Sequence, residues 1–419
     1  MVSRVDHPFD QLDALTPDEL YELESRRLTR LLQRARRAPF FRQRLSPELE
    51  QVPFLTREDL VAHGPPHSQA LLSAPLERAV VFQSGGTTGK PKYSLYSHAD
   101  YRRLSRSTGR TLWAPGLRPQ DRCANMFAVG ELYASFLTIH RGLEEVGATS
   151  FPFTFHAPRE QVLACLEPFS INVIMGLATQ MVALGEALMA AGGPRVNKLF
   201  YAAEHLYPED RQKLVEGLGL EVVATAGYGA VDVGMIGYQC PDCQGGMHHT
   251  LGGVVIVELV DEEDRVIRES GVTGHLVVTN LERFLMPVIR YRVGDLGRWV
   301  AGECPCGRAA PRFELLGRGD DVLRIGYENV TFEDVRAALG GLSTFTMIKR
   351  RPEGKDLLLI QVEQSVHREQ VVQNLLQRKP NLAEHVRQGY THPVCVEQVA
   401  KLERRAHSGK LRRVRDESL

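Results

Sequence analysis

The chain has 419 residues, of which 43% are hydrophobic and 24% are charged, a composition typical of globular proteins. A chain of this length exceeds one ordinary core, so we predict two or more domains. Lys+Arg and Asp+Glu number 51 each, so bulk charge favours neither nucleic acid nor a membrane surface as a partner. The N-terminal residues are polar, and Gln180 and Glu186 interrupt the most apolar stretch, 173–191. We therefore expect no signal peptide, no membrane span and a cytoplasmic location.

The N-terminal part of the chain is predicted to be helical. Thr16, Pro17 and Glu19 form a strong helix start, and leucines then recur at helical spacing to about residue 37. A second, short helix is expected to begin at Thr56. After it, residues 79–82 and 93–96 favour β-strands, and we predict that they form a hairpin around a glycine-rich loop.

The glycine-rich loop, residues 84–92, has the sequence S-G-G-T-T-G-K-P-K. Glycines let backbone N–H groups approach an anion closely, while hydroxyl and ammonium groups supply further donors. The loop is not a Walker A motif, because only three residues separate Gly85 from Gly89 and because Pro91 prevents a helix from starting there. We predict a phosphate-binding loop. The alternative is a surface hairpin loop rich in turn-forming residues.

From about residue 120 to 226, strand and helix patterns alternate. The predicted strands are residues 123–129, 149–153, 173–176, 199–202 and 222–226, and the predicted helices are residues 133–147, 158–168, 177–191 and 208–218. This alternation predicts a largely parallel, doubly wound sheet, whose ligands bind at the carboxyl ends of the strands. The segment that follows the last strand, Gly227, Tyr228 and Gly229, is therefore placed to meet a ligand.

The C-terminal half is predicted to contain a β-rich region and then a separate domain. Residues 250–316 carry strand patterns, and the chain after Gly317 has strand and helix patterns of its own. We therefore expect an α/β protein with two domains. Residues 1–317 would form a large domain with the doubly wound sheet and a β-rich subdomain, and residues 318–419 a small, mobile α+β domain.

Four of the seven cysteines form two close pairs, Cys240 with Cys243 and Cys304 with Cys306. In the reducing compartment that we expect, such pairs favour metal over disulfide. We predict a structural Zn²⁺, held most simply by all four sulfurs, with His248 as the first substitute for one of them. The alternative is four unmodified buried cysteines. A nucleic-acid-binding zinc ribbon is disfavoured, because the flanks lack a basic stripe with aromatic residues.

Five short segments, taken together, resemble the acyl-adenylate-forming superfamily. They are the loop 84–92, Y-G-A-V-D at 228–232, Y-R-V-G-D at 291–295, G-R-G-D-D at 317–321 and S-G-K at 408–410. Within this superfamily the chain is most similar to phenylacetate–CoA ligases and related aryl-CoA ligases, which share the segments R-A-P-F-F-R at 37–42, P-V-I-R-Y-R at 287–292 and C-P-C-G-R at 304–308. The resemblance implies ATP-dependent activation of an aryl or arylalkyl carboxylic acid as an acyl-AMP, followed by thioester formation with CoA.

The resemblance also implies roles for single residues around the phosphates. Asp232 takes the place of the usual Mg²⁺-binding glutamate, although its side chain is one methylene shorter. Lys410 would bridge the carboxylate and the α-phosphate during adenylation; seen alone, it would be a solvated member of a basic tail. The β- and γ-phosphates would be held by the loop residues Ser84, Gly85, Gly86, Thr87, Thr88, Gly89 and Lys92, with Lys90 left as a solvated neighbour.

The nucleoside and the acyl group would bind elsewhere on the large domain and at its junction with the small domain. Asp295 would bind the ribose hydroxyls, unless it is only a turn residue, and Arg318 would lie near the ribose or phosphate. The adenine would be contacted by Ala203, Glu204, Tyr228 and Gly229. The acyl pocket would be lined by Phe127, Tyr133, Phe136, Ala226 and Gly227, whose aromatic members are alternatively ordinary core residues.

Two other functions remain open from the sequence. The acyl group could pass to a carrier-protein thiol or an amine instead of CoA. Alternatively, the chain could be a non-catalytic adenylate-binding scaffold, because Asp232 and Val293 depart from the residues usual in the superfamily. The expected partners are a small carboxylic acid, ATP, Mg²⁺ and CoA or a carrier protein, without nucleic acid or membrane. A homodimer is left open.

Overall fold

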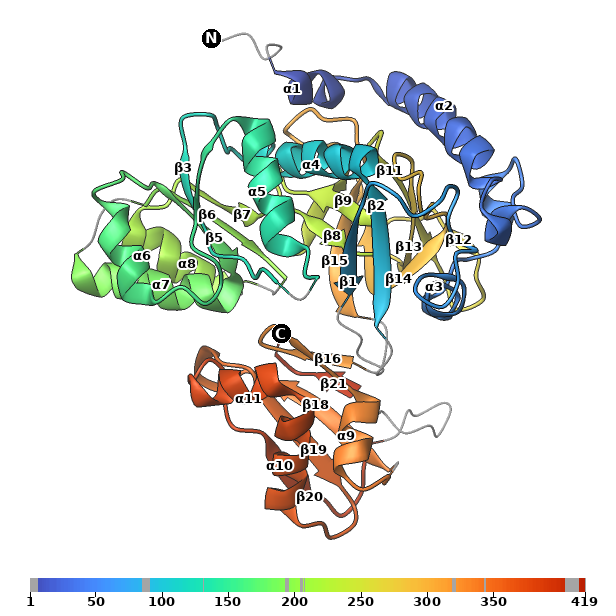
Figure 1. Cartoon of the computed structure of the whole chain (residues 1–419). Coiled ribbons are helices and arrows are strands. Elements are labelled where there is room, and N and C mark those ends of the chain that lie inside the picture. Colours follow the sequence, from blue (N-terminus) through green and yellow to red (C-terminus); the bar gives the residue numbers. More distant parts are fainter. Residues whose placement is uncertain are drawn as a thin grey trace. The chain divides into compact units, whose positions relative to one another are not determined.

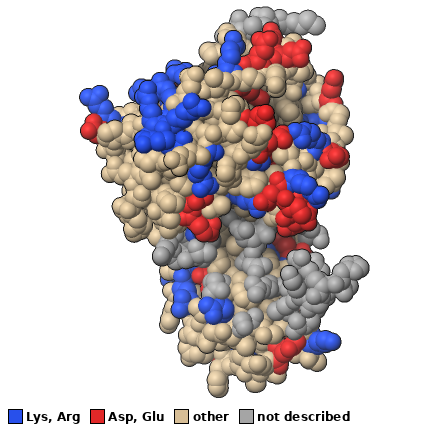
Figure 2. Space-filling model, turned by 90° about the vertical axis from the view of Figure 1, so that its right-hand side faces the viewer, with Lys and Arg blue, Asp and Glu red and all other residues tan. Residues whose placement is uncertain are grey.

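A computed structural model describes residues 7–84, 91–130, 132–192, 196–203, 206, 208–318, 322–342, 344–403 and 414–418 (Figure 1). The chain folds as two compact units, whose boundary lies between Gly317 and Arg318. Among the helices in the described ranges, none is both long enough and apolar enough to cross a membrane. Both signs of charge occur on the face shown in Figure 2, and neither covers it alone.

The first unit begins with helices and a hairpin, as predicted. Helix α2 starts with a full capping box, in which Thr16 Oγ1 accepts from Glu19 N at 3.3 Å and a Glu19 carboxylate oxygen accepts from Thr16 N at 2.8 Å. The hairpin strands pair antiparallel, with Ser84 opposite Lys92. The elements of this part are α1 (Pro8–Asp13), α2 (Pro17–Ala35), α3 (Arg57–His63), β1 (Ala79–Ser84), β2 (Lys92–Ser97) and α4 (His98–Trp113), with short 3₁₀ turns at Pro39–Phe41 and Leu49–Gln51.

A five-stranded parallel sheet follows, in the order β4-β3-β5-β6-β7. Its strands are β3 (Arg122–Asn125), β4 (Thr149–Pro152), β5 (Val173–Leu177), β6 (Lys198–Ala202) and β7 (Val222–Thr225). The chain passes from β3 to β4 on one side of the sheet and from β5 to β6 on the other, so the carboxyl ends of β3 and β5 border the crevice where such sheets bind ligands. This is the doubly wound arrangement that the alternating pattern predicts.

Helices cover both faces of this sheet (Figure 1). Side chains of α6 (Arg159–Leu166), α7 (Ala178–Ala191) and α8 (Pro208–Leu218) pack on one face, and those of α5 (Ser135–Val146) and α4 on the other. Alternate residues of β5 therefore enter different cores, Ile174 the first and Val173 and Met175 the second. Burial on both faces explains why the central strands β5 and β6 appear in the sequence as largely continuous apolar runs.

Helix α4 is buried, although its sequence is largely polar and no helix was predicted there. Its polar residues find partners within the protein; for example, Thr108 Oγ1 donates to Leu104 O at 2.9 Å. It also packs closely on α5, because Gly142 leaves room that a Cβ would fill, 2.6 Å from Thr108 Cγ2. Helical periodicity of apolar residues could not reveal this element, since tertiary contacts satisfy its polar groups.

The β-rich region forms an eight-stranded sheet in the order β12-β11-β13-β14-β15-β10-β9-β8. Its inward side chains share a core with α2 and the segment between α2 and β1. The strands are β8 (Tyr228–Ala230), β9 (Gly234–Tyr238), β10 (Met247–Thr250), β11 (Val255–Val260), β12 (Val266–Ile267), β13 (Thr273–Asn280), β14 (Tyr291–Trp299) and β15 (Arg312–Arg318). Since β8 follows β7 directly, the residues between them join the two sheets.

The second unit has a core of its own. A hairpin of β16 (Val322–Ile325) and β17 (Glu328–Thr331) precedes a mixed four-stranded sheet in the order β20-β19-β18-β21. The remaining elements are α9 (Phe332–Ala338), β18 (Phe345–Arg350), a 3₁₀ turn (Pro352–Gly354), β19 (Leu357–Val362), α10 (Arg368–Arg378), α11 (Pro380–Arg387), β20 (Cys395–Gln398) and β21 (Val414–Asp416).

Candidate active site

A buried ion pair joins two residues that the sequence singles out, Lys92 and Asp232. Lys92 begins β2, and its ammonium group contacts the carboxylate of Asp232, which lies between β8 and β9. Lys92 is 7% and Asp232 5% exposed. The glycine residues and threonines of the intervening loop, 85–90, lie outside the described residues, but both ends of the loop are in place, since Ser84 Oγ donates to Lys92 O at 3.5 Å.

Two further side chains complete this site, and neither was predicted from the sequence. Ser94 Oγ donates to Asp232 Oδ1 at 3.0 Å, and Tyr291 Oη lies 2.9 Å from Lys92 Nζ and 3.2 Å from Asp232 Oδ2. Ser94 follows Lys92 at the two-residue spacing of one strand face, which is a usable signal. Tyr291 comes from β14, so only the tertiary structure brings it here.

The surroundings of Asp232 keep its carboxyl group ionised. Burial by itself raises the pKa of Asp232, but the nearby charge of Lys92, the hydrogen bonds from Lys92 and Ser94 and the charge of Arg283 outweigh it, so the pKa lies below its usual value. Arg283 also donates to the backbone carbonyl of Asp232 and lies over the ring of Tyr96, 4.1 Å from its centroid. The site therefore holds a fixed negative charge beside a fixed positive one.

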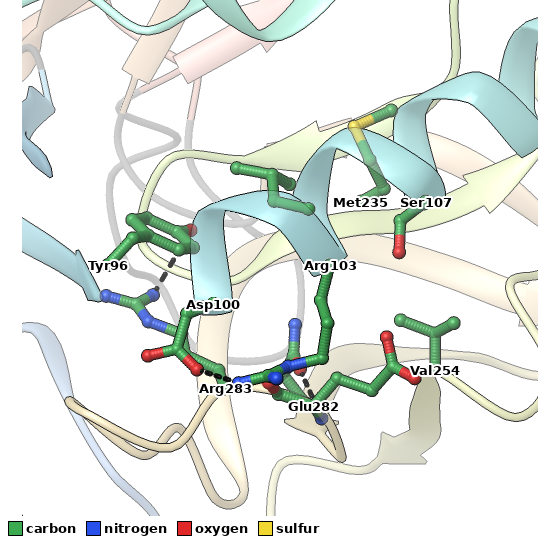
Figure 3. A pocket seen from close by; sticks show the side chains of 10 residues that line it. Tyr96, Asp100, Arg103, Ser107, Met235, Val254, Glu282 and Arg283 are labelled. Atoms are coloured by element: carbon green, nitrogen blue, oxygen red, sulfur yellow. Dashed lines mark hydrogen bonds and ion pairs between the residues drawn. The ribbon is translucent and has the colours of Figure 1, made fainter. Parts of the chain in front are cut away.

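A small pocket adjoins this site, behind Arg283 and Tyr96 (Figure 3). Asp100 of α4 points into it and accepts from the backbone N–H groups of Phe284 and Leu285, each at 3.0 Å. Arg103 donates to the carbonyl of Glu282 at 2.7 Å. These polar groups bond one another, so the pocket supports the segment that carries Arg283 and does not offer an unoccupied set of donors.

A second pair of predicted residues meets at the start of β8. Tyr228 Oη donates to Asp295 Oδ2 at 2.6 Å, although the two residues lie on different strands. Gly227 just before Tyr228 has φ +118°, and a Cβ there would lie 2.4 Å from Met235 Cε and 2.8 Å from Thr111 Oγ1. Only glycine fits this turn without strain, so Gly227 fixes where the Tyr228 ring stands.

The remaining predicted nucleotide residues are only partly described. Ala203 follows β6 with φ +71°, a left-handed conformation at the carboxyl edge of the sheet. Glu204 lies outside the described residues, and so do Gly85, Gly86, Thr87, Thr88, Gly89 and Lys410; the backbone of Arg318 is described, but its side chain is not.

The predicted acyl-pocket residues divide into two groups. Phe127 and Phe136, together with Ala226, pack in the core between α5 and the parallel sheet, and Phe127 is only 1% exposed. Tyr133 is 41% exposed. For the two phenylalanines the described contacts are those of core residues, which was the alternative interpretation.

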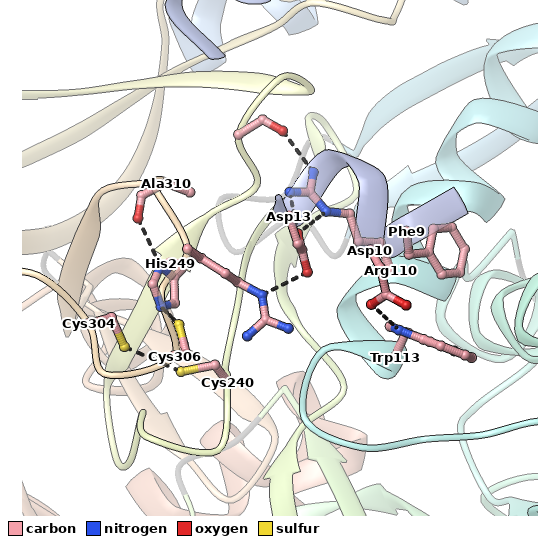
Figure 4. Close-up of polar contacts among 12 residues, drawn as sticks. Phe9, Asp10, Asp13, Arg110, Trp113, Cys240, His249, Cys304, Cys306 and Ala310 are labelled. Atoms are coloured by element: carbon pink, nitrogen blue, oxygen red, sulfur yellow. Dashed lines mark hydrogen bonds and ion pairs between the residues drawn. The ribbon is translucent and has the colours of Figure 1, made fainter. Parts of the chain in front are cut away.

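The two cysteine pairs come together, and Figure 4 shows Cys240, Cys304 and Cys306. Cys240 Sγ lies 3.5 Å from Cys243 Sγ and 3.6 Å from Cys304 Sγ. A tetrahedral Zn²⁺ with bonds of about 2.3 Å to sulfur holds its sulfurs about 3.8 Å apart, so these spacings fit that ion. The ligand atoms of Cys240, Cys243, His249 and Cys304 all lie within 4.8 Å of one another, and we call these four residues the cysteine cluster.

The histidine in this cluster is His249, and the expectation of His248 is corrected. His249 Nδ1 donates to Ala310 O at 2.8 Å, which leaves Nε2 as an electron-pair donor facing the sulfurs, 3.4 Å from Cys306 Sγ. Cys306 belongs instead to a second group, with Cys240, Asp242 and Cys304. Adjacent residues of a strand point to opposite faces, so β10 can bring only one of its two histidines to the sulfurs.

Comparisons with known proteins identify the family. The sequence model of the AMP-binding enzyme family matches residues 22–284. The chain belongs to this family. It is 30% identical over 348 residues to the phenylacetate-coenzyme A ligase of Thermus thermophilus, covering 78% of this chain and 77% of the relative, and 27% identical over 346 residues to that of Escherichia coli, covering 77% and 76%.

A solved structure also matches both units of this AMP-binding enzyme. It is that of 2-hydroxyisobutyryl-CoA ligase in complex with 2-HIB-AMP and CoA, with a TM-score of 0.76 at 25% identity, covering 97% of this chain and 91% of that one. The α/β fold and the resemblance to phenylacetate–CoA ligases, both inferred from the sequence, are therefore confirmed.

Proposed function

We propose that this AMP-binding enzyme is an ATP-dependent carboxylate–CoA ligase that acts on an aryl or arylalkyl acid. The observation that carries the proposal is that the residues assigned to the phosphates, Lys92 and Asp232, contact each other, and that those assigned to the nucleoside, Tyr228 and Asp295, do so as well. The named relatives are CoA ligases, which favours CoA over a carrier protein or an amine as the acceptor. The non-catalytic alternative is not favoured by them.

The proposed chemistry has two steps. In the first, a carboxylate oxygen attacks the α-phosphorus of ATP, a P–O bond forms, and the bond to pyrophosphate breaks. In the second, the sulfur of CoA attacks the acyl carbonyl, a C–S bond forms, and AMP leaves. Both reactants of the first step are anions, so positive groups must be fixed near the phosphates before they meet.

Lys92 can supply such a positive charge. Its ammonium group already binds one anion, the carboxylate of Asp232, and phosphate oxygens can take the place of that carboxylate. Incoming phosphate oxygens compete with Asp232 for the Lys92 ammonium, while Tyr291 keeps a hydrogen-bonding group beside it. Tyr228 would stack on the adenine and Asp295 would accept from ribose hydroxyls. Lys410, carried by the smaller unit, would bridge the carboxylate and the α-phosphate in the first step, and movement of that unit would admit CoA.

Mg²⁺ is general for this enzyme class, and we propose Asp232 as its ligand. A carboxylate oxygen is the donor that Mg²⁺ prefers. Both oxygens of Asp232 already accept hydrogen bonds, so the ion reaches this carboxylate only when Lys92 turns towards the phosphates. When bound, Mg²⁺ would neutralise phosphate charge.

We further propose that the cysteine cluster holds a structural Zn²⁺. Three thiolates and one imidazole are a common ligand set for closed, structural zinc sites, and the donor spacing fits. Metal analysis should find one zinc per chain, lost in Cys243→Ser and kept in Cys395→Ser, whose thiol is exposed and lies in the smaller unit. Wild-type protein without stoichiometric zinc would contradict this site.

The decisive test of the ligase function is a screen for carboxylate-dependent pyrophosphate release. Benzoates, phenylacetates and heteroaryl acids are offered with ATP and Mg²⁺, with and without CoA, and products are identified by mass spectrometry. We expect acyl-CoA from aryl or arylalkyl acids. Release of pyrophosphate without formation of acyl-CoA would indicate that the acceptor is a carrier protein or an amine.

We place the enzyme in the cytoplasm, where ATP and CoA are available and thiols stay reduced. The proposal requires no homodimer.

A further inference from the structure

Strand β10 presents its two histidines to different sites. It lies between β15 and β9, with His248 opposite Phe313 and His249 opposite both Arg312 and Tyr238. Both histidines are buried, at 3% and 0% exposure. A strand held on both sides by backbone hydrogen bonds cannot shift its backbone at one of these residues without shifting it at the other.

The side chain of His249 faces the sulfurs of the cysteine cluster (Figure 4). Its Nδ1 is held by the Ala310 carbonyl, so Nε2 has one direction in which to offer its electron pair. A metal bound there would fix the imidazole through a bond much stronger than a hydrogen bond. The backbone of β10 would then be fixed with it.

The side chain of His248 faces the nucleoside residues. Its Nδ1 donates to Gly246 O at 2.8 Å, so Nε2 accepts from Thr225 Oγ1 at 3.3 Å. The ring of His248 lies 5.9 Å from that of Tyr228 and 5.9 Å from that of Phe313, and Tyr228 packs edge-on to Phe313 at 5.8 Å. The rings of His248, Phe313 and Tyr228 therefore contact one another, and those of His248 and Phe313 support the ring of Tyr228.

We propose that β10 couples the cysteine cluster to the nucleotide pocket, with His248 as the positioning residue. Metal on the cluster fixes His249, the strand carries that constraint to His248, and His248 holds Tyr228 where its hydroxyl bonds Asp295. This inference rests on the proposed function, since it takes Tyr228 and Asp295 as nucleoside ligands. The cluster would then position the nucleoside residues in addition to joining the loops that carry Cys240 and Cys304.

The first experiment compares AMP binding by zinc-loaded and chelator-treated enzyme, using calorimetry. We expect removal of zinc to weaken AMP binding by about tenfold, within the usual range of coupling between sites. Coupling of binding free energies is reciprocal, so saturating AMP should raise the affinity of the enzyme for zinc by a comparable factor, measured by competition between zinc-loaded enzyme and a chelator. Unchanged AMP affinity after chelation of a protein that stays folded, or a zinc affinity that AMP leaves unchanged, would overturn the coupling.

The second experiment tests whether His248 carries the effect. His248→Leu removes both hydrogen bonds and the ring, whereas His248→Phe keeps a ring against Tyr228 and Phe313. We expect the KM for ATP to rise about tenfold in His248→Leu and less in His248→Phe, with the KM for the carboxylate nearly unchanged. The control is His275→Gln, a histidine of the same sheet that pairs with Glu262 at the surface, and it should behave as wild type.

The two perturbations should not add. If β10 is the route, chelation of His248→Leu weakens AMP binding little further, as expected for residues that act through one element. Fully additive losses would show that the cluster acts by another route and would refute the role of His248. Wild-type enzyme that binds no AMP and releases no pyrophosphate would refute the proposed function instead, so the two failures are distinguishable.

Discussion

The ion pair between Lys92 and Asp232 has consequences for stability as well as for the proposed catalysis. Asp232→Asn keeps the size of the side chain but removes the pairing charge from a site that is almost fully buried. We expect the free energy of unfolding of the larger unit to fall by about 3–5 kcal/mol, the usual effect of breaking a buried pair. Urea denaturation followed by tryptophan fluorescence measures it, since Trp113 and Trp299 both lie in this unit.

The matched control for this variant is Ser94→Ala. It removes one neutral donor to the same carboxylate, and we expect a loss of about 1 kcal/mol. Equal losses in the two variants would show that the hydrogen bonds, and not the charge of Lys92, hold Asp232 in place.

His385 of the smaller unit makes stability depend on pH. Its side chain is 1% exposed, neither ring nitrogen has a hydrogen-bond partner among the described residues, and its ring meets that of Tyr327 at 3.9 Å. Burial lowers the pKa of His385 from 6.5 to about 4. The unfolded chain therefore binds the proton more readily, so stability is complete above about pH 6.5 and is lost as the pH falls towards 4.

The expected size of this effect follows from the two pKa values. Between pH 7 and pH 5 the smaller unit should lose about 2 kcal/mol through this group. His385→Phe should remove most of that difference, whereas His367→Gln, an exposed histidine of the same unit, should keep it. Hydrogen exchange of α11 and β19 at both pH values is the measurement, and the same pH dependence in His385→Phe would exclude His385 as its source.

At the scale of whole elements, two carboxylates attach helix α1 to the rest of the larger unit. Asp13 accepts from Arg110 of α4 at 2.7 and 2.9 Å and from Arg308 at 2.7 Å, and Asp10 accepts from the Trp113 indole at 2.9 Å (Figure 4). Arg308 follows Cys306 closely in the chain. Asp13 therefore links α1, α4 and the loop that carries Cys304 of the cysteine cluster.

We predict that Asp13→Asn releases α1 and this loop together. The buried Arg110 loses a counter-charge, so a loss of about 3 kcal/mol is expected. Hydrogen exchange should quicken in α1 and in residues 304–308. Glu144→Gln breaks an exposed pair with Arg141 on α5 and should cost about 0.5 kcal/mol at most. Faster exchange in α1 alone would show that Arg308 does not depend on Asp13.

At the scale of the whole molecule, the proposed reaction needs a residue of each unit. Lys410→Ala should slow carboxylate-dependent pyrophosphate release by about 10²-fold or more, the usual effect of losing one group that stabilises transition-state charge. Thioester formation from supplied acyl-AMP should change far less. Lys401→Ala, an exposed lysine of the same tail, is the control and should leave both half-reactions unchanged. Equal slowing of both half-reactions would contradict a role specific to adenylation.

Part of the fold could be predicted from local sequence patterns alone. The central strands β5 and β6 of the parallel sheet could be predicted because helices bury both of their faces, which leaves apolar runs. The starts of α2 and α3 could be predicted because a capping box is complete within four residues. Lys92, Asp232, Tyr228 and Asp295 were singled out because each lies in a short segment that resembles a motif of the family, and their catalytic and binding roles stay predictions.

The remainder depends on contacts between distant segments, which no local pattern records. Helix α4 is stable in the core because Arg110 pairs with Asp13 and hydroxyl groups of the helix donate to backbone carbonyls. Its polar sequence therefore does not indicate a buried helix. Tyr291 joins Lys92 from another sheet. The family, the parallel sheet and the grouping of the cysteines could all be inferred from sequence alone. That His249 faces the sulfurs and His248 faces Tyr228 could not, because strand pairing sets which side of β10 each residue occupies.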